Sequence, residues 1–243
     1  MEKIAVIGAG LVGGLEAIYL ARQGHDVTIY ERRGDLRSAT IIAGRSINLA
    51  LSDRGWKALE VAGVSDRIQE IAIPMKGRMM HAVSGELTYQ PYGKDGQAIF
   101  SVSRGELNRQ LLLAADTFDN VAFRFREKCL DLDLKTNELV FENQESGTVE
   151  RVAADRIIAT DGAFSAVRSR LQRTDRFNYS QHYLPHGYKE LTIPAAADGS
   201  HQLDKHALHI WPRGEYMLIA LPNLDGSFTV TLFLPRHGPE SFA

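Results

Sequence analysis

The sequence predicts an α/β protein in which a parallel sheet of strand–helix–strand units is joined to a second, mainly antiparallel sheet. Residues 3–7 are apolar and β-branched, as expected for a buried strand. Residues 12–23 carry apolar side chains at helical spacing, and Gly24 follows as a stop. After about residue 177 the segments read as strands, with no convincing helix among them.

The composition is that of an ordinary globular protein. The chain has 243 residues, of which 44% are hydrophobic and 24% charged, and its formal net charge is -2. This balance argues against disorder and fibrous repeats, and it shows no nucleic-acid or membrane-surface footprint. The single cysteine, Cys129, excludes an internal disulfide, and no Cys/His cluster has the spacing of a metal site. We therefore expect no nucleic-acid partner and no metal.

The N-terminal segment favours a cytoplasmic location. The apolar run after Met1 is too short for a signal peptide, because glycines follow at once. No stretch approaches the roughly 18 to 20 apolar residues that span a bilayer.

The elements of the parallel part follow in order. A strand over residues 26–30, ending at Glu31, completes a strand–helix–strand unit of the size expected for a parallel crossover. Residues 53–62 predict a short helix, and residues 76–102 predict short strands separated by turns. Ser103 and Glu106 form a capping box that begins a helix over residues 104–117. Several strands follow between residues 121 and 159.

The antiparallel part is predicted from four strand-like segments, at residues 186–193, 206–211, 215–221 and 227–234. A turn at residues 222–226 precedes the last of them. We assign residues 1–75 and 97–176 to one domain, and residues 76–96 and 177–243 to the other.

The first motif is G-x-G-x-x-G at residues 8–13, between the first strand and the first helix. Gly8 permits the tight turn, Gly10 lets the backbone approach a pyrophosphate, and Gly13 lets helix pack against strand. The helix N-terminus then offers free N–H groups to phosphates, and Glu31 can accept hydrogen bonds from a ribose diol. The motif predicts a Rossmann-like dinucleotide site without separating NAD from FAD, and Glu31 disfavours NADP there. The alternative is a glycine-rich turn without a ligand.

The second motif is the strand-to-helix segment 157–168, which contains Asp161-Gly162. By itself it is a common turn. Paired with an N-terminal glycine motif, it resembles the single-component FAD monooxygenases, flavoprotein hydroxylases of the GR2 type. In that family the glycine motif binds the ADP part of FAD, and the Asp-Gly segment lies near the pyrophosphate and serves both FAD and NAD(P)H.

Five segments narrow this resemblance: residues 44–52, 73–81, 101–104, 179–188 and 208–213. Together they are similar to the kynurenine 3-monooxygenase family, and the similarity runs through essentially the whole chain. The resemblance implies hydroxylation of L-kynurenine to 3-hydroxykynurenine, a step of tryptophan degradation. It further implies bound FAD, NADPH as a transient reductant, and O₂ as co-substrate. No catalytic side chain is implied, because the flavin carries the chemistry.

The resemblance also assigns residue roles. Arg78 would grip the substrate carboxylate, and Tyr92 would donate a second hydrogen bond to it. From sequence alone, a surface arginine and an ordinary turn tyrosine remain open for these two. The residues implied for FAD are Gly8, Gly10, Val12, Gly13, Glu31, Arg32, Arg33, Ala50, Arg104, Cys129 and Asp161. For Cys129, a buried small apolar residue is the favoured interpretation over thiol chemistry.

The resemblance breaks at the C-terminal end. Members of the family continue well beyond this point, through a Gly-Asp segment whose acid binds the flavin ribityl chain. No such segment occurs in residues 1–243. We therefore expect a fold that is incomplete at the C-terminus. The alternatives to a kynurenine hydroxylase are a catalytically incompetent FAD-binding fragment and another FAD-dependent aromatic monooxygenase.

Overall fold

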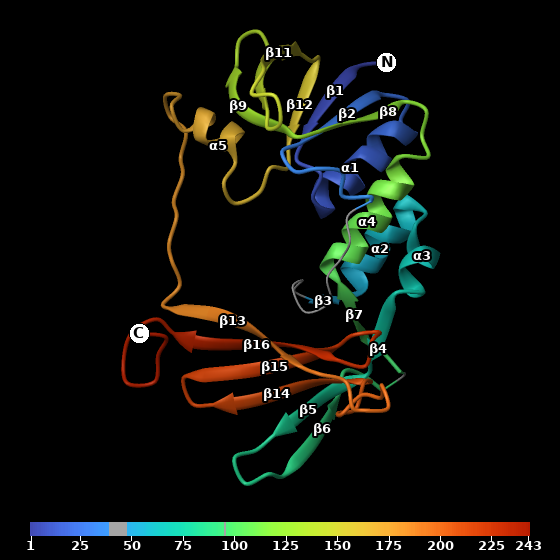
Figure 1. Ribbon diagram of the computed structural model, residues 1–243, viewed down its shortest axis with the longest axis vertical. Coiled ribbons are helices and arrows are strands. Elements are labelled where there is room, and N and C mark those ends of the chain that lie inside the picture. Colours follow the sequence, from blue (N-terminus) through green and yellow to red (C-terminus); the bar gives the residue numbers. More distant parts are fainter. Residues whose placement is uncertain (39–47, 95) are drawn as a thin grey trace. The chain divides into compact units, whose positions relative to one another are not determined.

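The computed structural model describes residues 1–38, 48–94 and 96–243, which fall into two compact units (Figure 1). Unit 1 consists of Met1–Thr40 and Asn108–Gln181, and unit 2 of Ile41–Leu107 and His182–Ala243. The boundaries of these units differ from those of the two domains that we assigned from the sequence, and that assignment stays a prediction. Residues 44–47 of the first family-like segment lie outside the described residues.

Unit 1 is built on a parallel four-stranded sheet with the strand order β12-β1-β2-β8. The strands are β1 (Lys3–Ile7), β2 (Asp26–Glu31), β8 (Val121–Phe125) and β12 (Arg156–Ala159). Helix α1 (Leu11–Arg22) connects β1 to β2, and Gly24 follows it with φ +82°, where glycine is favoured. The predicted strand–helix–strand unit is confirmed to within one residue at each boundary.

The inner face of α1 packs closely on α4 (Arg104–Ala115). A Cβ placed on Gly14 would lie 3.2 Å from Leu111 and 3.3 Å from Leu112, so glycine at this position lets the two helices approach. The helix predicted over residues 104–117 is confirmed, but it ends two residues earlier, at Ala115. The backbone N–H of Glu106 lies 3.4 Å from the hydroxyl of Ser103, which supplies one half of the predicted capping box.

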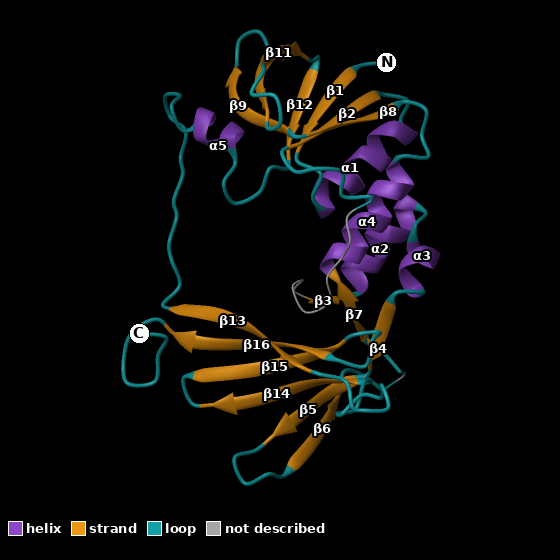
Figure 2. Ribbon diagram, viewed as in Figure 1, coloured by secondary structure: helices purple, strands orange, loops and turns teal. Residues whose placement is uncertain are grey.

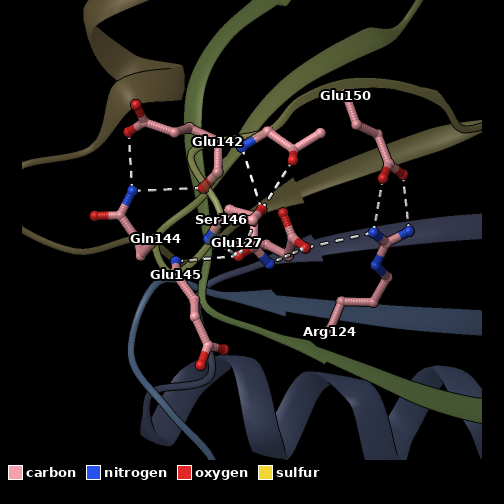
Figure 3. Close-up of polar contacts among 9 residues, drawn as sticks. Arg124, Glu127, Glu142, Gln144, Glu145, Ser146 and Glu150 are labelled. Carbon is pink, nitrogen blue, oxygen red and sulfur yellow. Dashed lines mark hydrogen bonds and ion pairs between the residues drawn. The ribbon is translucent and has the colours of Figure 1, made fainter.

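A small antiparallel sheet follows in unit 1, formed by β9 (Glu127–Asp133), β10 (Glu138–Asn143) and β11 (Val149–Ala153). Helix α5 (Ala166–Leu171) and this sheet share a core in which the rings of Tyr30 and Phe141 stack with centroids 4.2 Å apart. Figure 3 shows the polar contacts around Arg124, which donates two hydrogen bonds of 2.8 Å to Glu150. This bidentate pair ties β8 to β11.

Unit 2 contains a six-stranded sheet with the order β13-β16-β15-β14-β5-β6. The strands are β5 (Gly77–His81), β6 (Leu87–Pro91), β13 (His186–Ile193), β14 (Ala207–Arg213), β15 (Tyr216–Pro222) and β16 (Phe228–Pro235). As Figure 2 shows, no helix follows α5, and the four strands predicted after residue 177 are confirmed. Every neighbouring pair is antiparallel except β5 and β14, which run parallel.

A second sheet of unit 2 has three antiparallel strands: β3 (Asn48–Leu51), β7 (Ile99–Ser103) and β4 (Ala72–Met75). Helix α2 (Asp53–Ala62) has the predicted bounds, whereas α3 (Ser65–Gln69), β3 and β4 were not predicted. The side-chain amide of Asn48 donates to the Ser101 hydroxyl at 3.0 Å and to the Pro222 carbonyl at 3.1 Å. These buried bonds join the small sheet to β15. None of the helices within residues 1–38, 48–94 and 96–243 is long and apolar enough to cross a membrane.

Candidate functional site

The glycine motif forms a loop in which two of the three glycines are required by packing. Gly8 has φ +102°, and a Cβ there would lie 2.7 Å from the Thr160 carbonyl oxygen. A Cβ on Gly13 would overlap the carbonyl oxygen of Gly8 and lie 2.8 Å from the Thr160 hydroxyl. Around Gly10, by contrast, no heavy atom of the described chain lies within 4 Å of such a Cβ. The loop is therefore fixed by its backbone and open on the side of Gly10.

The N-terminus of α1 faces this open space without a side-chain cap. Gly10 is the N-cap residue in extended conformation, and the described part of the chain shows no side-chain hydrogen bond that caps the helix there. Val12 in that turn is 65% exposed. Uncapped N–H groups together with the helix dipole suit an anionic group such as a pyrophosphate.

Glu31 lies at the end of β2 and holds the glycine loop. Its carboxylate is 4% exposed and accepts hydrogen bonds from the Ala9 N–H at 2.9 Å and from the backbone N–H and Nε of Arg33 at 2.9 and 2.8 Å. Burial alone would raise the pKa of Glu31, but the hydrogen bonds from Arg33 and Ala9 outweigh it and the pKa is lowered. Arg32 is exposed. Glu31 is thus an ionised anchor whose oxygens already have protein donors.

The Asp-Gly motif lies directly beside the glycine loop. The backbone N–H of Thr160 donates to the Ile7 carbonyl at 2.8 Å, and its hydroxyl lies 2.8 Å from the carbonyl oxygens of both Ile7 and Gly8. Asp161 accepts from the Ala166 N–H through Oδ2 at 2.8 Å, while its buried Oδ1 has no partner among the described residues. Such an oxygen is costly to leave unpaired, so the position fits a bound donor.

Cys129 packs as a small apolar residue in the core of unit 1. Burial, with the charges of Asp161 and Asp131, raises the pKa of the thiol to about 12. A raised pKa disfavours the thiolate, which is the nucleophilic form, near pH 7.

In unit 2, Arg78 and Tyr92 meet although thirteen residues separate them in the sequence. The Arg78 guanidinium lies 5.3 Å from the centre of the Tyr92 ring, which is a cation–π distance. The Tyr92 backbone N–H donates to the Lys76 carbonyl at 3.0 Å, which closes the hairpin. The Tyr92 hydroxyl is buried and has no partner among the described residues, whereas Arg78 is exposed. A guanidinium over the ring of a tyrosine whose hydroxyl lacks a described partner makes this a candidate site for a carboxylate.

Ala50 and Arg104 are also placed within unit 2. Ala50 is exposed on β3 and pairs with Ser101 on β7. Arg104 is exposed at the first position of α4, directly after β7. An arginine there opposes the helix dipole, which an anionic ligand would offset.

Three further features were missed by the sequence analysis. Asn108 donates to the Ala9 carbonyl at 3.1 Å, and its Oδ1 is buried without a partner among the described residues. Thr160 supports the glycine loop as described above. His81 and His209 form a hydrogen bond of 2.8 Å. Asparagine is a poor helix former, so its place inside a predicted helix was a usable signal. The histidines gave none, because strand pairing alone brings them together.

Comparison with known proteins gives the family. The model of the FAD binding domain family matches residues 1–213. Kynurenine 3-monooxygenase from Christiangramia forsetii is 51% identical over 241 residues, covering 99% of this chain and 54% of its own length. The enzyme of the same name from Dictyostelium discoideum is 47% identical, covering 100% of this chain and 52% of its own length. The chain thus spans about half the length of the curated relatives it matches.

Solved structures show the same fold at low identity. The tetrameric form of 2-methyl-3-hydroxypyridine-5-carboxylic acid oxygenase has a TM-score of 0.76 and 19% identity, covering 98% of this chain and 60% of that one. The probable FAD-dependent monooxygenase pqsL from Pseudomonas aeruginosa has a TM-score of 0.68 and 18% identity, covering 97% and 61%. This confirms the α/β fold predicted from the sequence, and the match over residues 1–213 shows that the chain belongs to the FAD binding domain family.

Proposed function

We propose that this chain supplies the cofactor-binding and substrate-carboxylate residues of an FAD-dependent monooxygenase that uses NADPH and O₂ to convert L-kynurenine to 3-hydroxykynurenine. The observation that supports this substrate is that the Arg78 guanidinium lies over the ring of Tyr92, whose buried hydroxyl has no partner among the described residues. Relatives named kynurenine 3-monooxygenase are 45–53% identical, which supports the same choice.

The residues of unit 1 fit the nucleotide part of FAD. Gly8, Gly10 and Gly13, with the uncapped α1 N-terminus at Val12, would hold the pyrophosphate. The other residues of the proposal are Glu31, Arg32 and Arg33 around the adenosine ribose, Cys129 near the adenine, and Asp161. Oδ1 of Asp161 has no partner among the described residues and would accept a hydrogen bond from a hydroxyl or N–H group of the cofactor. In unit 2, Ala50 and Arg104 are assigned to the flavin part.

Bound FAD, once reduced by NADPH, supplies the activation of oxygen. The chain's own residues bind and orient. A guanidinium offers two parallel N–H donors, so Arg78 can take both carboxylate oxygens of an amino acid, while the Tyr92 hydroxyl donates to one of them. Fixing the carboxylate at one point fixes the direction in which the aromatic ring extends, which is the contribution of orientation to the rate.

The function is tested by supplying the protein with FAD, NADPH and L-kynurenine under ¹⁸O₂. We expect one NADPH oxidised per 3-hydroxykynurenine formed, with the new hydroxyl oxygen derived from O₂. NADPH oxidation that responds to another aromatic compound and not to kynurenine would indicate a different FAD-dependent aromatic monooxygenase. Stoichiometric FAD without turnover on any aromatic compound would indicate a binding module. A cytoplasmic location stays a prediction of the sequence.

A further inference from the structure

Arg78 and Tyr92 are carried by an arm, defined here as residues 76–92, which meets the rest of its sheet along one edge. The arm contains β5 and β6, and all five residues of β6 are exposed. Within the six-stranded sheet, β5 pairs on its inner side only with β14, through four residue pairs from Ala207↔Gly77 to Ile210↔Met80. The position of Arg78 in this sheet therefore depends on that one parallel pairing.

Side chains reinforce the pairing at its C-terminal end. Nε2 of His81 lies 2.8 Å from Nδ1 of His209, and Nε2 of His209 lies 2.9 Å from the Asp204 carbonyl oxygen. The ring of His81 stacks on Trp211 at 4.1 Å, and Arg213 donates to the His81 carbonyl at 2.9 Å. The Lys76 N–H donates to the His206 carbonyl at 2.8 Å at the start of the arm, and Nδ1 of His206 lies 3.0 Å from the Pro74 carbonyl oxygen just before it.

The partners determine which histidine donates. A carbonyl oxygen only accepts, so Nε2 of His209 must donate to Asp204. His209 is 2% exposed, and burial lowers its pKa, so it is neutral and its Nδ1 is an acceptor. His81 therefore donates from Nε2 to His209. Removing this donor leaves a buried ring nitrogen without a partner.

We propose that His81 and His209 are positioning residues for Arg78: their hydrogen bond fixes β5 against β14 and thereby holds the arm, with both Arg78 and Tyr92, in place on the sheet. In the register of the two strands, Arg78 pairs with Leu208 and the next pair is Met79 with His209. Side chains alternate along a strand, so His81 lies on the opposite face from Arg78 and does not reach a ligand bound there. The proposal rests on the proposed function in that Arg78 must bind the substrate carboxylate.

The test uses His81→Phe, which keeps an aromatic ring for the stack on Trp211 but cannot donate. In the FAD-loaded protein we expect the Kd for kynurenine to rise about tenfold, with FAD content unchanged. The Kd for the analogue that lacks only the carboxylate should not change. His81→Gln, which restores an N–H donor, should return the kynurenine Kd towards the original value. His186→Phe is the matched control. His186 lies on β13, at the opposite edge of the same sheet from the arm, and its Nε2 lies 2.9 Å from the Glu215 carbonyl oxygen.

An equal loss of affinity for both compounds would overturn the proposal, since it would show general damage to the sheet. No loss for either compound would overturn it as well. In an Arg78→Ala background, His81→Phe should have no further effect on kynurenine binding, and an additive effect would contradict a role through Arg78. If Arg78→Ala itself leaves kynurenine binding unchanged, the proposed function fails too. If Arg78→Ala strongly weakens kynurenine binding and His81→Phe does not change it, only the positioning role of His81 is refuted and the proposed function stands.

Discussion

The glycine loop of unit 1 and the Arg78–Tyr92 pair of unit 2 are built on different principles. The loop is determined by backbone contacts, since added Cβ atoms at Gly8 and Gly13 would meet carbonyl oxygens, and Glu31, Thr160 and Asn108 hold it from several sides. The Arg78–Tyr92 pair consists of two side chains on the arm, which joins the rest of its sheet through the pairing of β5 with β14. In our proposal, the bound cofactor is thus contacted by rigid backbone, and the exchangeable substrate by a few side chains.

The largest expected effect is that of Gly13→Ala, which tests whether the glycine loop is rigid. Gly13→Ala places a Cβ against the backbone oxygen of Gly8, which cannot move without displacing β1. We expect a loss of about 3 kcal/mol or more in the free energy of unfolding, together with loss of bound FAD. Urea unfolding and flavin absorbance measure the two effects.

Gly10→Ala is the matched control for this prediction. Its Cβ meets no described atom and its φ of -79° suits alanine, so stability should change by less than about 0.5 kcal/mol. FAD affinity should still fall, because the added methyl group occupies the space we assign to the pyrophosphate. Equal stability losses in the two variants would break the contrast between packed and open glycines.

A second prediction concerns the ionised anchor of the loop. Glu31→Gln removes the negative charge that accepts from Ala9 and Arg33, at a cost of about 1–3 kcal/mol near pH 7. The folded-state pKa of Glu31 lies below its ordinary value of 4.5. Its charge-dependent stabilisation is therefore complete above that value and is lost as the pH falls through the lower, folded-state pKa.

The measurement for Glu31 is the difference in unfolding free energy between the original chain and Glu31→Gln across pH 3 to 7. This difference should be largest at pH 7 and should become smaller as the pH falls towards 3. Glu60→Gln, at an exposed position on α2, should show almost no difference at any pH. A Glu31→Gln difference that is constant with pH would show that the carboxylate is not the source of the stabilisation.

The smallest expected effect is that of Tyr92→Phe. Because the Tyr92 hydroxyl is buried and has no partner within the described ranges, its removal should leave stability unchanged or raise it slightly. The Kd for kynurenine should rise about fivefold, since one hydrogen bond to the carboxylate is lost. Isothermal titration measures this, and a clear loss of stability instead would assign the hydroxyl a structural role.

The same contrast explains what could be predicted from the sequence. The strand–glycine–helix segment at residues 3–22 is local, so its elements and the crowded glycines followed from spacing and were confirmed. The short strands β3 and β4 were missed because their pairing with β7 involves residues far away in the sequence. The meeting of Arg78 with Tyr92 came only from the family resemblance, and the His81–His209 bond from neither source. Both depend on non-local pairing, which no local pattern encodes.

The role of Arg78 is tested by measuring how strongly the FAD-loaded protein prefers kynurenine over its carboxylate-free analogue. Arg78→Ala should raise the Kd for kynurenine about 10- to 100-fold, as expected for the loss of a charged hydrogen-bonded pair. The Kd for the analogue and the FAD content should stay close to their original values, and Lys76→Ala, an exposed lysine next to β5, should change neither ligand's Kd. If Arg78→Ala keeps the preference for kynurenine, or loses FAD while kynurenine binding is unchanged, Arg78 does not bind the substrate carboxylate.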